Sequence, residues 1–209
     1  MKSLTTSELN NALLDVRKAY RLLYEYQKRV LDTVNYISNN LGYTDYKGGV
    51  PQFTKPSPGY NKGTLSNWAW DWLNMYYYEF YFGGKSIAGK DVHLSIVLLS
   101  DTGFYDKNTD NNKKTDLDCF NSVEQSQTKL ILAIADHAWS GTTAKLGKLL
   151  NQYEKQELVY EYAIEDQQKL IIAKNYNLAL FLNKETTNLQ IKDFEFFCRN
   201  NNLQITENK

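Results

Sequence analysis

Apolar residues recur along the N-terminal part of the chain at spacings that alternate between four and three. This spacing places them on one face of a helix and predicts a helix from Thr6 to Leu41. Thr5 followed by Glu8 has the form of a capping box, and Gly42 stands where a helix end favours glycine. Only Gln27 interrupts the apolar stripe, which consists of Leu9, Leu13, Val16, Tyr20, Leu23, Val30, Val34, Ile37 and Leu41.

The predicted helix of about 36 residues is about 54 Å long, which exceeds the diameter of a compact domain of this size. One interpretation is that the stripe packs on the rest of the same chain. The other is that the heptad spacing forms a coiled coil with a second copy or with a protein partner. The residues expected at such an interface are Leu9, Leu13, Val16, Tyr20, Leu23, Val30 and Val34.

The segment after the helix is rich in residues that break regular structure. All three prolines and five of the 11 glycines lie between Gly42 and Gly63, which predicts a loop. We expect four aromatic side chains to anchor it: Tyr43, Tyr46, Phe53 and Tyr60. The chain is then organised as a long helix (1–41), a Pro/Gly-rich loop (42–65) and a body (66–209), within a single domain overall.

The body begins with alternating rather than helical spacing. A short helix capped by Thr64 or Ser66 and ending at Trp72 precedes a strand from Met75 to Phe82, and Gly83, Gly84 and Gly89 bracket a turn. The next strand runs from Asp91 to Ser100. Its residues alternate between an apolar face of Val92, Leu94, Ile96 and Leu98 and a polar face of Asp91, His93 and Ser95.

Further short elements complete the body. The pattern predicts a strand at 129–136, a helix from Thr142 or Thr143 to about Lys155, strands at 158–164, 169–174 and 177–182, and a last helix capped by Thr187 or Asn188. Strands joined by short turns favour an α+β fold. We expect a mainly antiparallel sheet of about five to six strands, with the long N-terminal helix and a C-terminal helix packed on it.

Aromatic residues are concentrated between Asn67 and Phe82, where they make up nine of 16 positions and include three of the four tryptophans. Such a segment is either core or the wall of a ligand groove. In the second interpretation the rings stack a base, a nucleotide or a sugar while a lysine meets phosphate. The ligand-binding residues predicted in this way are Trp68, Trp70, Trp72, Tyr76, Tyr78 and Lys85.

The two histidines each stand near an aspartate at a predicted strand end. His93 lies near Asp91, and His137 follows Asp136. If the two strands are antiparallel neighbours, these side chains meet and have the chemistry to bind a divalent metal and activate water. This spacing matches no recognised ligand motif. Acid–base pairs from carboxylates on strands, such as Glu79 and Asp91, are a related hypothesis.

Composition narrows the classes of function. Lys plus Arg and Asp plus Glu both number 24, which disfavours nucleic acid and an anionic membrane as general partners. No signal peptide and no long apolar run is visible, and the two cysteines form no pair motif, so we expect a soluble cytoplasmic protein. Abundant Asn, Lys and Tyr are typical of a bacterial genome of low GC content.

No catalytic motif is present: the sequence lacks a G-x-S-x-G elbow, an H-E-x-x-H helix and a glycine-rich phosphate loop. We therefore predict a binding or interaction protein that needs no cofactor and assembles with itself or a partner through the long helix and an aromatic surface. The alternatives are a small metal-dependent hydrolase or nuclease, and a nucleotide or single-strand nucleic-acid binder.

Overall fold

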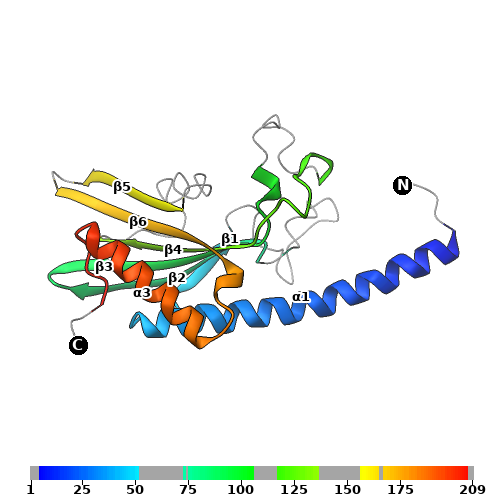
Figure 1. The fold of residues 1–209 in the computed structure, drawn as a ribbon, viewed down its shortest axis with the longest axis horizontal. Coiled ribbons are helices and arrows are strands. Elements are labelled where there is room, and N and C mark those ends of the chain that lie inside the picture. The colour runs from blue at the N-terminus through cyan, green and yellow to red at the C-terminus, as the bar shows by residue number, and fades with distance from the viewer. Residues whose placement is uncertain are drawn as a thin grey trace, which may run out of the picture. The chain divides into compact units, whose positions relative to one another are not determined.

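The computed structural model describes residues 5–51, 73, 75–105, 117–136, 156–164 and 167–206. The chain divides into two compact units, Met1–Tyr36 and Ile37–Lys209. The first unit contains most of helix α1 (Thr6–Asn40), and the second contains a six-stranded sheet and helix α3 (Lys184–Asn200). Figure 1 shows these elements, and they confirm the predicted α+β class.

Helix α1 begins and ends where the sequence predicts. The backbone N–H of Thr5 donates to Glu8 Oε2 at 2.8 Å, and the backbone N–H of Glu8 donates to Thr5 Oγ1 at 3.3 Å. These two bonds satisfy donors that a helix leaves unpaired at its start. At the other end Gly42 adopts a φ of 76°, a conformation that glycine reaches without strain.

The sheet has the order β1-β2-β3-β4-β6-β5, and every pair of neighbouring strands is antiparallel. Its strands are β1 (Gly48–Pro51), β2 (Tyr77–Ile87), β3 (Lys90–Leu99), β4 (Lys129–Ala135), β5 (Glu157–Ile164) and β6 (Gln167–Asn177). Short 3-10 turns η2 (Thr102–Tyr105) and η4 (Leu117–Cys119) follow β3 and precede β4. The predicted strands at 91–100, 129–136 and 158–164 are confirmed.

Two predictions near the first strands are wrong. The loop expected from Gly42 onward contains strand β1, which pairs with β2 as an edge strand. Strand β2 does not stop at Phe82 but continues to Ile87, because a bulge between Tyr81 and Gly83 absorbs the glycines that we expected in a turn. The turn itself lies at Ala88 and Gly89, which have positive φ values of 50° and 78°.

The C-terminal part also departs from two predictions. A third strand at 177–182 is absent: β6 ends at Asn177, and Leu178–Leu180 form the 3-10 turn η5. Helix α3 is not capped by Thr187 or Asn188. Asn183 is its N-cap, and the Asn183 side chain accepts from the N–H of Thr186 at 3.0 Å, while the Thr186 hydroxyl accepts from the N–H of Asn183 at 3.1 Å.

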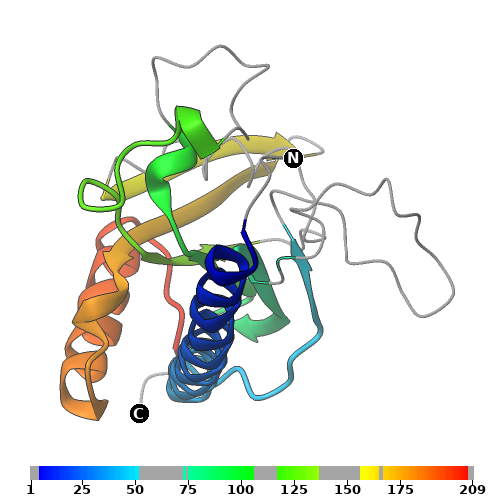
Figure 2. The same ribbon diagram turned by 90° about the vertical axis from the view of Figure 1, so that its right-hand side faces the viewer.

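Helix α3 lies along one face of the sheet in both views (Figures 1 and 2). Its Asp193 accepts a hydrogen bond from Tyr176 of β6 at 2.7 Å and forms an ion pair with Lys174 at 2.9 Å. The strand register places the apolar face of β3, predicted from alternation, on this same side. The buried side chains of this layer include Leu94, Ile96, Leu98, Leu130, Leu132, Phe194 and Cys198.

The opposite face of the sheet carries a second buried cluster. It consists of Tyr77, Val97, Leu99, Ile131, Ala133, Ala135, Leu158, Ile171 and Ala173, with Tyr76, Phe120, Tyr160 and Tyr162 packed against it. Both faces of the central strands are therefore apolar, which explains why β4 reads as a continuous apolar run rather than as an alternating one.

The short helix predicted up to Trp72, the helix predicted at 142–155 and the loop anchors Phe53 and Tyr60 lie outside the described residues. Of the predicted anchors that are described, Tyr43 is buried, and its hydroxyl donates to the Val92 carbonyl at 3.0 Å. No helix among the described residues is both long and apolar enough to cross a membrane.

Candidate functional site

Five polar side chains lie side by side on β2 and β3, on the sheet face opposite α3. The register places Tyr81 opposite Ser95 and Gly84 opposite His93, and Glu79 lies two residues before Tyr81, on the same face of β2. We call Glu79, Tyr81, Asp91, His93 and Ser95 the polar row. Glu79 and Ser95 are fully buried and His93 nearly so, which is unusual for polar groups on a strand unless they bind one another.

His93 lies between two partners that occupy both of its ring nitrogens. The Tyr81 hydroxyl is 2.7 Å from Nδ1, and the Asp91 carboxylate is 2.8 Å from Nε2. The Tyr81 and His93 rings are nearly parallel, with 4° between their planes. Asp91 is mostly exposed, whereas the imidazole is buried, so the relay of three groups runs from the surface into the sheet face.

The tautomer of His93 sets which partner donates in each of these hydrogen bonds. Burial raises the pKa of Tyr81, and the nearby Asp91 and Glu79 carboxylates raise it further. A phenol that keeps its proton can donate to Nδ1 of a neutral imidazole, and Nε2–H of that tautomer then donates to Asp91. A carboxylate that orients an imidazole, with a hydroxyl on the other ring nitrogen, is an arrangement suited to proton transfer.

The two glycines of the β2 bulge make room for this relay. Gly83 has a φ of 73°, in the left-handed region, and it shifts the register of β2 against β3. As a result Gly84 lies opposite His93, and a Cβ added at Gly84 would overlap the imidazole ring. The sequence pattern indicated the proximity of Asp91 and His93. Tyr81 was missed because the pairing of β2 with β3 was not known, and Gly84 was missed because the bulge was not foreseen.

The inner end of the polar row is a buried acid. Ser95 Oγ donates to Glu79 Oε1 at 2.6 Å, and neither side chain is exposed. On the neighbouring strand β4, the residues opposite Ser95 and His93 are Ala133 and Ala135. The polar row is thus bordered on β4 by small apolar side chains. Glu79 is one of the carboxylates that the sequence suggested for acid–base chemistry.

The metal hypothesis required that the ends of β3 and β4 meet, and the strands are indeed antiparallel neighbours. Asp136, however, accepts from the N–H of Leu170 at 2.8 Å and lies 3.9 Å from Lys90 Nζ. His137 lies outside the described residues, and within these residues no three His, Cys, Asp or Glu side chains form a potential metal site. The metal site stays a prediction.

The predicted aromatic groove is only partly described. Trp68, Trp70 and Trp72 lie outside the described residues, whereas Tyr76 packs against the second buried cluster and the Tyr78 ring lies 5.0 Å from that of Phe80. Lys85 was expected to meet phosphate. Its ammonium donates to the Leu41 carbonyl at 2.7 Å and lies 4.3 Å from the centroid of the Tyr43 ring, so it stabilises the chain after α1.

The predicted interface residues on α1 separate into two groups. Val30 and Val34 are buried, with 0% and 3% exposure, whereas Leu9, Leu13 and Val16 are 43–47% exposed and Tyr20 is 71% exposed. Leu23 lies between these extremes. The apolar stripe is therefore buried at its C-terminal end and exposed at its N-terminal end.

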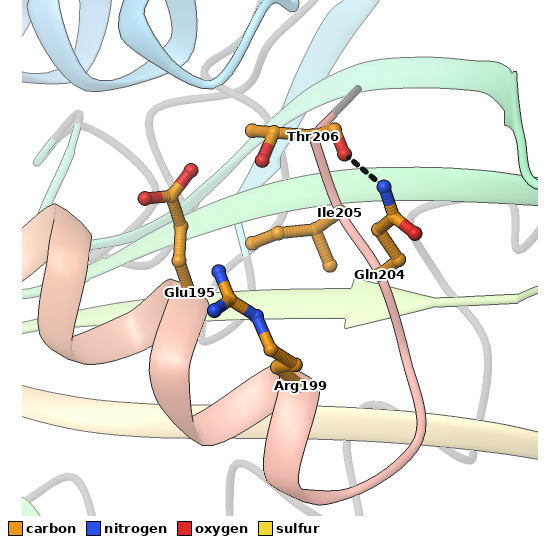
Figure 3. A pocket seen from close by; sticks show the side chains of 5 residues that line it. All are labelled: Glu195, Arg199, Gln204, Ile205 and Thr206. Atoms are coloured by element: carbon orange, nitrogen blue, oxygen red, sulfur yellow. Dashed lines mark hydrogen bonds between the residues drawn. The ribbon is translucent and has the colours of Figure 1, made fainter. Parts of the chain in front are cut away.

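A hollow of about 250 Å³ lies where the chain after α3 turns back along the helix. Figure 3 shows its lining residues, Glu195 and Arg199 from α3 and Gln204, Ile205 and Thr206 from the following segment. The Gln204 amide donates to the Thr206 carbonyl at 2.8 Å. No buried polar side chain among these residues points into the hollow, so it lacks the convergent polar groups of a ligand site.

Comparison with known proteins places the chain in a family. The family described as PM0109 matches residues 6–204. The uncharacterized protein PM0109 of Pasteurella multocida (strain Pm70) is 58% identical over 40 residues, which span 19% of this chain and only 20% of that relative. No solved structure matches the chain significantly. Neither description states an activity, and the chain belongs to the PM0109 family.

Proposed function

We propose that this protein is a binding protein that assembles through the open part of the α1 stripe, which we call the exposed stripe: Leu9, Leu13, Val16, Tyr20 and Leu23. A second copy of the chain is the first candidate for its partner, and another protein is the alternative. The observation that carries the proposal is that Leu9, Leu13, Val16 and Tyr20 are 43–71% exposed, although they continue the line of the buried Val30 and Val34.

The energetics of a single helix support this proposal. Most of the stability of a helix in a protein comes from packing of its apolar face, not from intrinsic propensity. Burying one large aliphatic side chain contributes about 1.5–3 kcal/mol, so covering a row of such residues offsets part of the entropy cost of ordering the helix. A partner on the exposed stripe supplies this burial.

The test compares two substitutions on the same helix by sedimentation of the full-length protein. Leu13→Glu combined with Val16→Glu places charge within the exposed stripe, and we expect it to abolish association. Leu22→Glu is the matched control, because Leu22 is 73% exposed but does not belong to the stripe. We expect this variant to associate like the unsubstituted protein.

For a partner of another kind, the same variants are compared by affinity purification of the tagged protein from its native host. A protein lost with the stripe variant and retained with Leu22→Glu supports the proposal. A protein that sediments as a monomer of 24.3 kDa and shows no stripe-dependent partner contradicts it. The cytoplasmic location expected from the sequence belongs to this proposal and is tested by fractionation of the same cells.

A second candidate function is proton-transfer catalysis at the polar row, the non-metal form of the hydrolase alternative. The position of His93 between Tyr81 and Asp91 favours it. The experiment is a screen for ester and phosphodiester hydrolysis, with and without Mn²⁺, by the native protein and by His93→Gln. Turnover that His93→Gln removes supports this candidate, and an absence of turnover across the screen sets it aside.

A further inference from the structure

We infer that the occupant of the exposed stripe is a second copy of this chain, whose α1 helix lies antiparallel to the first. In the proposed register, a residue of one copy faces a residue of the other copy such that the two residue numbers add up to 36; Val16, for example, faces Tyr20. This inference rests on the proposed function and names its partner. The reasons are the extent of the exposed stripe and the distribution of charge along α1.

The stripe contains two series of positions with heptad spacing. One series holds Leu13, Tyr20 and Gln27, and the other holds Leu9, Val16 and Leu23. In an antiparallel pair of helices, the residues of one series face those of the other. The pairing therefore sets Leu13 against Leu23, Val16 against Tyr20 and Leu9 against Gln27 of the second copy.

This register is the one that matches the observed burial. It uses every exposed or half-buried position of the stripe from Leu9 to Gln27 and ends before the buried Val30. A shift by one heptad in one direction sets Leu23 against Thr6, the polar first residue of α1. A shift in the other direction requires Val34, which is already buried.

The one polar residue that interrupts the stripe, Gln27, also suits this register. Gln27 lies opposite Leu9 at each end of the paired segment, where water reaches the amide, while the centre holds the Val16 and Tyr20 layers. Interfaces that exclude water generally have an apolar centre and a polar rim. In a parallel pair, by contrast, two Gln27 side chains would face one another beside the buried part of the stripe.

Charge distinguishes an antiparallel from a parallel pair. The first turns of α1 carry Glu8 and Asp15 and no basic residue, whereas the segment 17–29 carries five basic residues, Arg17, Lys18, Arg21, Lys28 and Arg29, and one acid, Glu25. An antiparallel pair brings Glu8 level with Lys28, and Asp15 level with Arg21, of the second copy. A parallel pair sets the basic segments side by side, where like charges repel.

The acidic first turns of α1 and its basic segment 17–29 produce electrostatic potentials of opposite sign along the helix. Asp15 also pairs with Lys18 of its own helix at 3.0 Å, but both side chains are largely exposed. Exposed pairs of this kind contribute little to stability, so they leave the field between the two helices in place. Oppositely directed helix dipoles favour the same arrangement.

Disulfide trapping of full-length protein tests the pairing. Leu13→Cys and Leu23→Cys are made as separate variants in a Cys119→Ser background, because Cys198 is buried and does not compete. One variant carries a mass tag, and the two are mixed and oxidised mildly. The predicted antiparallel register brings the two engineered sulfurs within the reach of a disulfide. It keeps two copies of Leu13→Cys about 15 Å apart along the helix axis.

We expect a cross-link between Leu13→Cys and Leu23→Cys in at least tenfold excess over cross-links within either variant. Leu22→Cys, which lies off the stripe, is the matched control and should cross-link only weakly with Leu13→Cys. A dominant Leu13→Cys homodimer indicates a parallel pair and overturns the inference.

The outcome also separates this inference from the proposed function. If sedimentation shows assembly that Leu13→Glu with Val16→Glu abolishes, but no cross-link forms between the two cysteine variants, the inference is wrong while the proposed function stands. If no stripe-dependent assembly is found with any partner, both are wrong.

Discussion

The imidazole of His93 lies over Gly84, the residue directly opposite it on the neighbouring strand, so that no other side chain fits at this position. The bulge at Gly83 brings Gly84 to this place. The sequence suggested that Gly84 belongs to a turn, but Gly84 lies within strand β2, in contact with the buried ring of His93. The relay of Tyr81, His93 and Asp91 therefore depends on the backbone of β2 as well as on its own side chains.

Gly84→Ala is expected to displace the His93 ring and to destabilise the protein by about 1–3 kcal/mol, the usual cost of forcing extra atoms into a packed site. The measurement is urea unfolding followed by tryptophan fluorescence. Ser86→Ala is the control, since Ser86 is exposed and lies on the same face of β2. Equal stability of the two variants would show that the ring has space to move.

Tyr81→Phe removes the hydroxyl that lies 2.7 Å from Nδ1 of His93. The loss of one such hydrogen bond costs about 0.5–1.5 kcal/mol, and the tautomer of His93 is then no longer fixed by a phenol. Nitrogen chemical shifts of the imidazole measure the tautomer directly. The chain contains only two histidines, so a His93→Gln variant assigns the signals. Unchanged shifts in Tyr81→Phe would mean that Asp91 alone sets the tautomer.

Stability is expected to fall as the pH rises above about 10. Burial raises the pKa of Tyr43 and of Tyr176, and the bond from Tyr176 to Asp193 raises the latter further. In the unfolded chain a tyrosine loses its proton near pH 10. Because the folded state then holds more protons than the unfolded state, the free energy of unfolding decreases with rising pH.

Denaturant titrations at about pH 8 and about pH 10.5 measure this decrease, since the interval brackets the ordinary tyrosine pKa. Tyr176→Phe should show a smaller difference between the two conditions than the unsubstituted protein. Lys174 contributes in the same direction. Burial lowers its pKa, but hydrogen bonds to Glu157 and Asp193 outweigh this effect and raise it. A pH-independent free energy of unfolding would contradict this account of the buried layer.

The two thiols are expected to react at very different rates. Cys198 is fully buried, and burial raises the pKa of its thiol above the usual range, whereas Cys119 is partly exposed. Because the thiolate is the reactive form, an alkylating reagent should label Cys119 first and Cys198 only on unfolding. Mass spectrometry of time points, with Cys119→Ser as the control, gives both rates. Rapid labelling of Cys198 would show that α3 opens readily.

The elements with a strong local signal were predictable. The stripe on α1, its Thr5 and Glu8 capping box and the alternation along β3 all appear where the sequence indicates. Strand β1 was not predictable, because an edge strand is held by backbone bonds to β2 and leaves no side-chain pattern. The start of α3 was misplaced because Asn183 with Thr186 forms the capping box, which standard Ser/Thr-x-x-Glu patterns do not describe.

The candidate site residues also divide into those that a local sequence pattern predicts and those that only strand pairing brings together. Asp91 and His93 are two residues apart on one strand, so their proximity follows from strand geometry alone. Tyr81 joins them only through the pairing of β2 with β3, where it lies opposite Ser95 ahead of the bulge, whereas the bulge sets Gly84 opposite His93. The contacts of Asp136 with Leu170 and Lys90 likewise join residues that no sequence spacing brings together.

The strand order has a consequence for the folding pathway. The β2–β3 and β5–β6 pairs are hairpins between segments close in sequence, whereas β4 pairs with β6 across a wide separation, as between Lys129 and Asn177. Closing such long loops costs entropy before any contact repays it. We therefore expect the two hairpins to form early and the joining of β4 to β6 to limit the folding rate, so that substitutions along that seam slow refolding more than those within either hairpin.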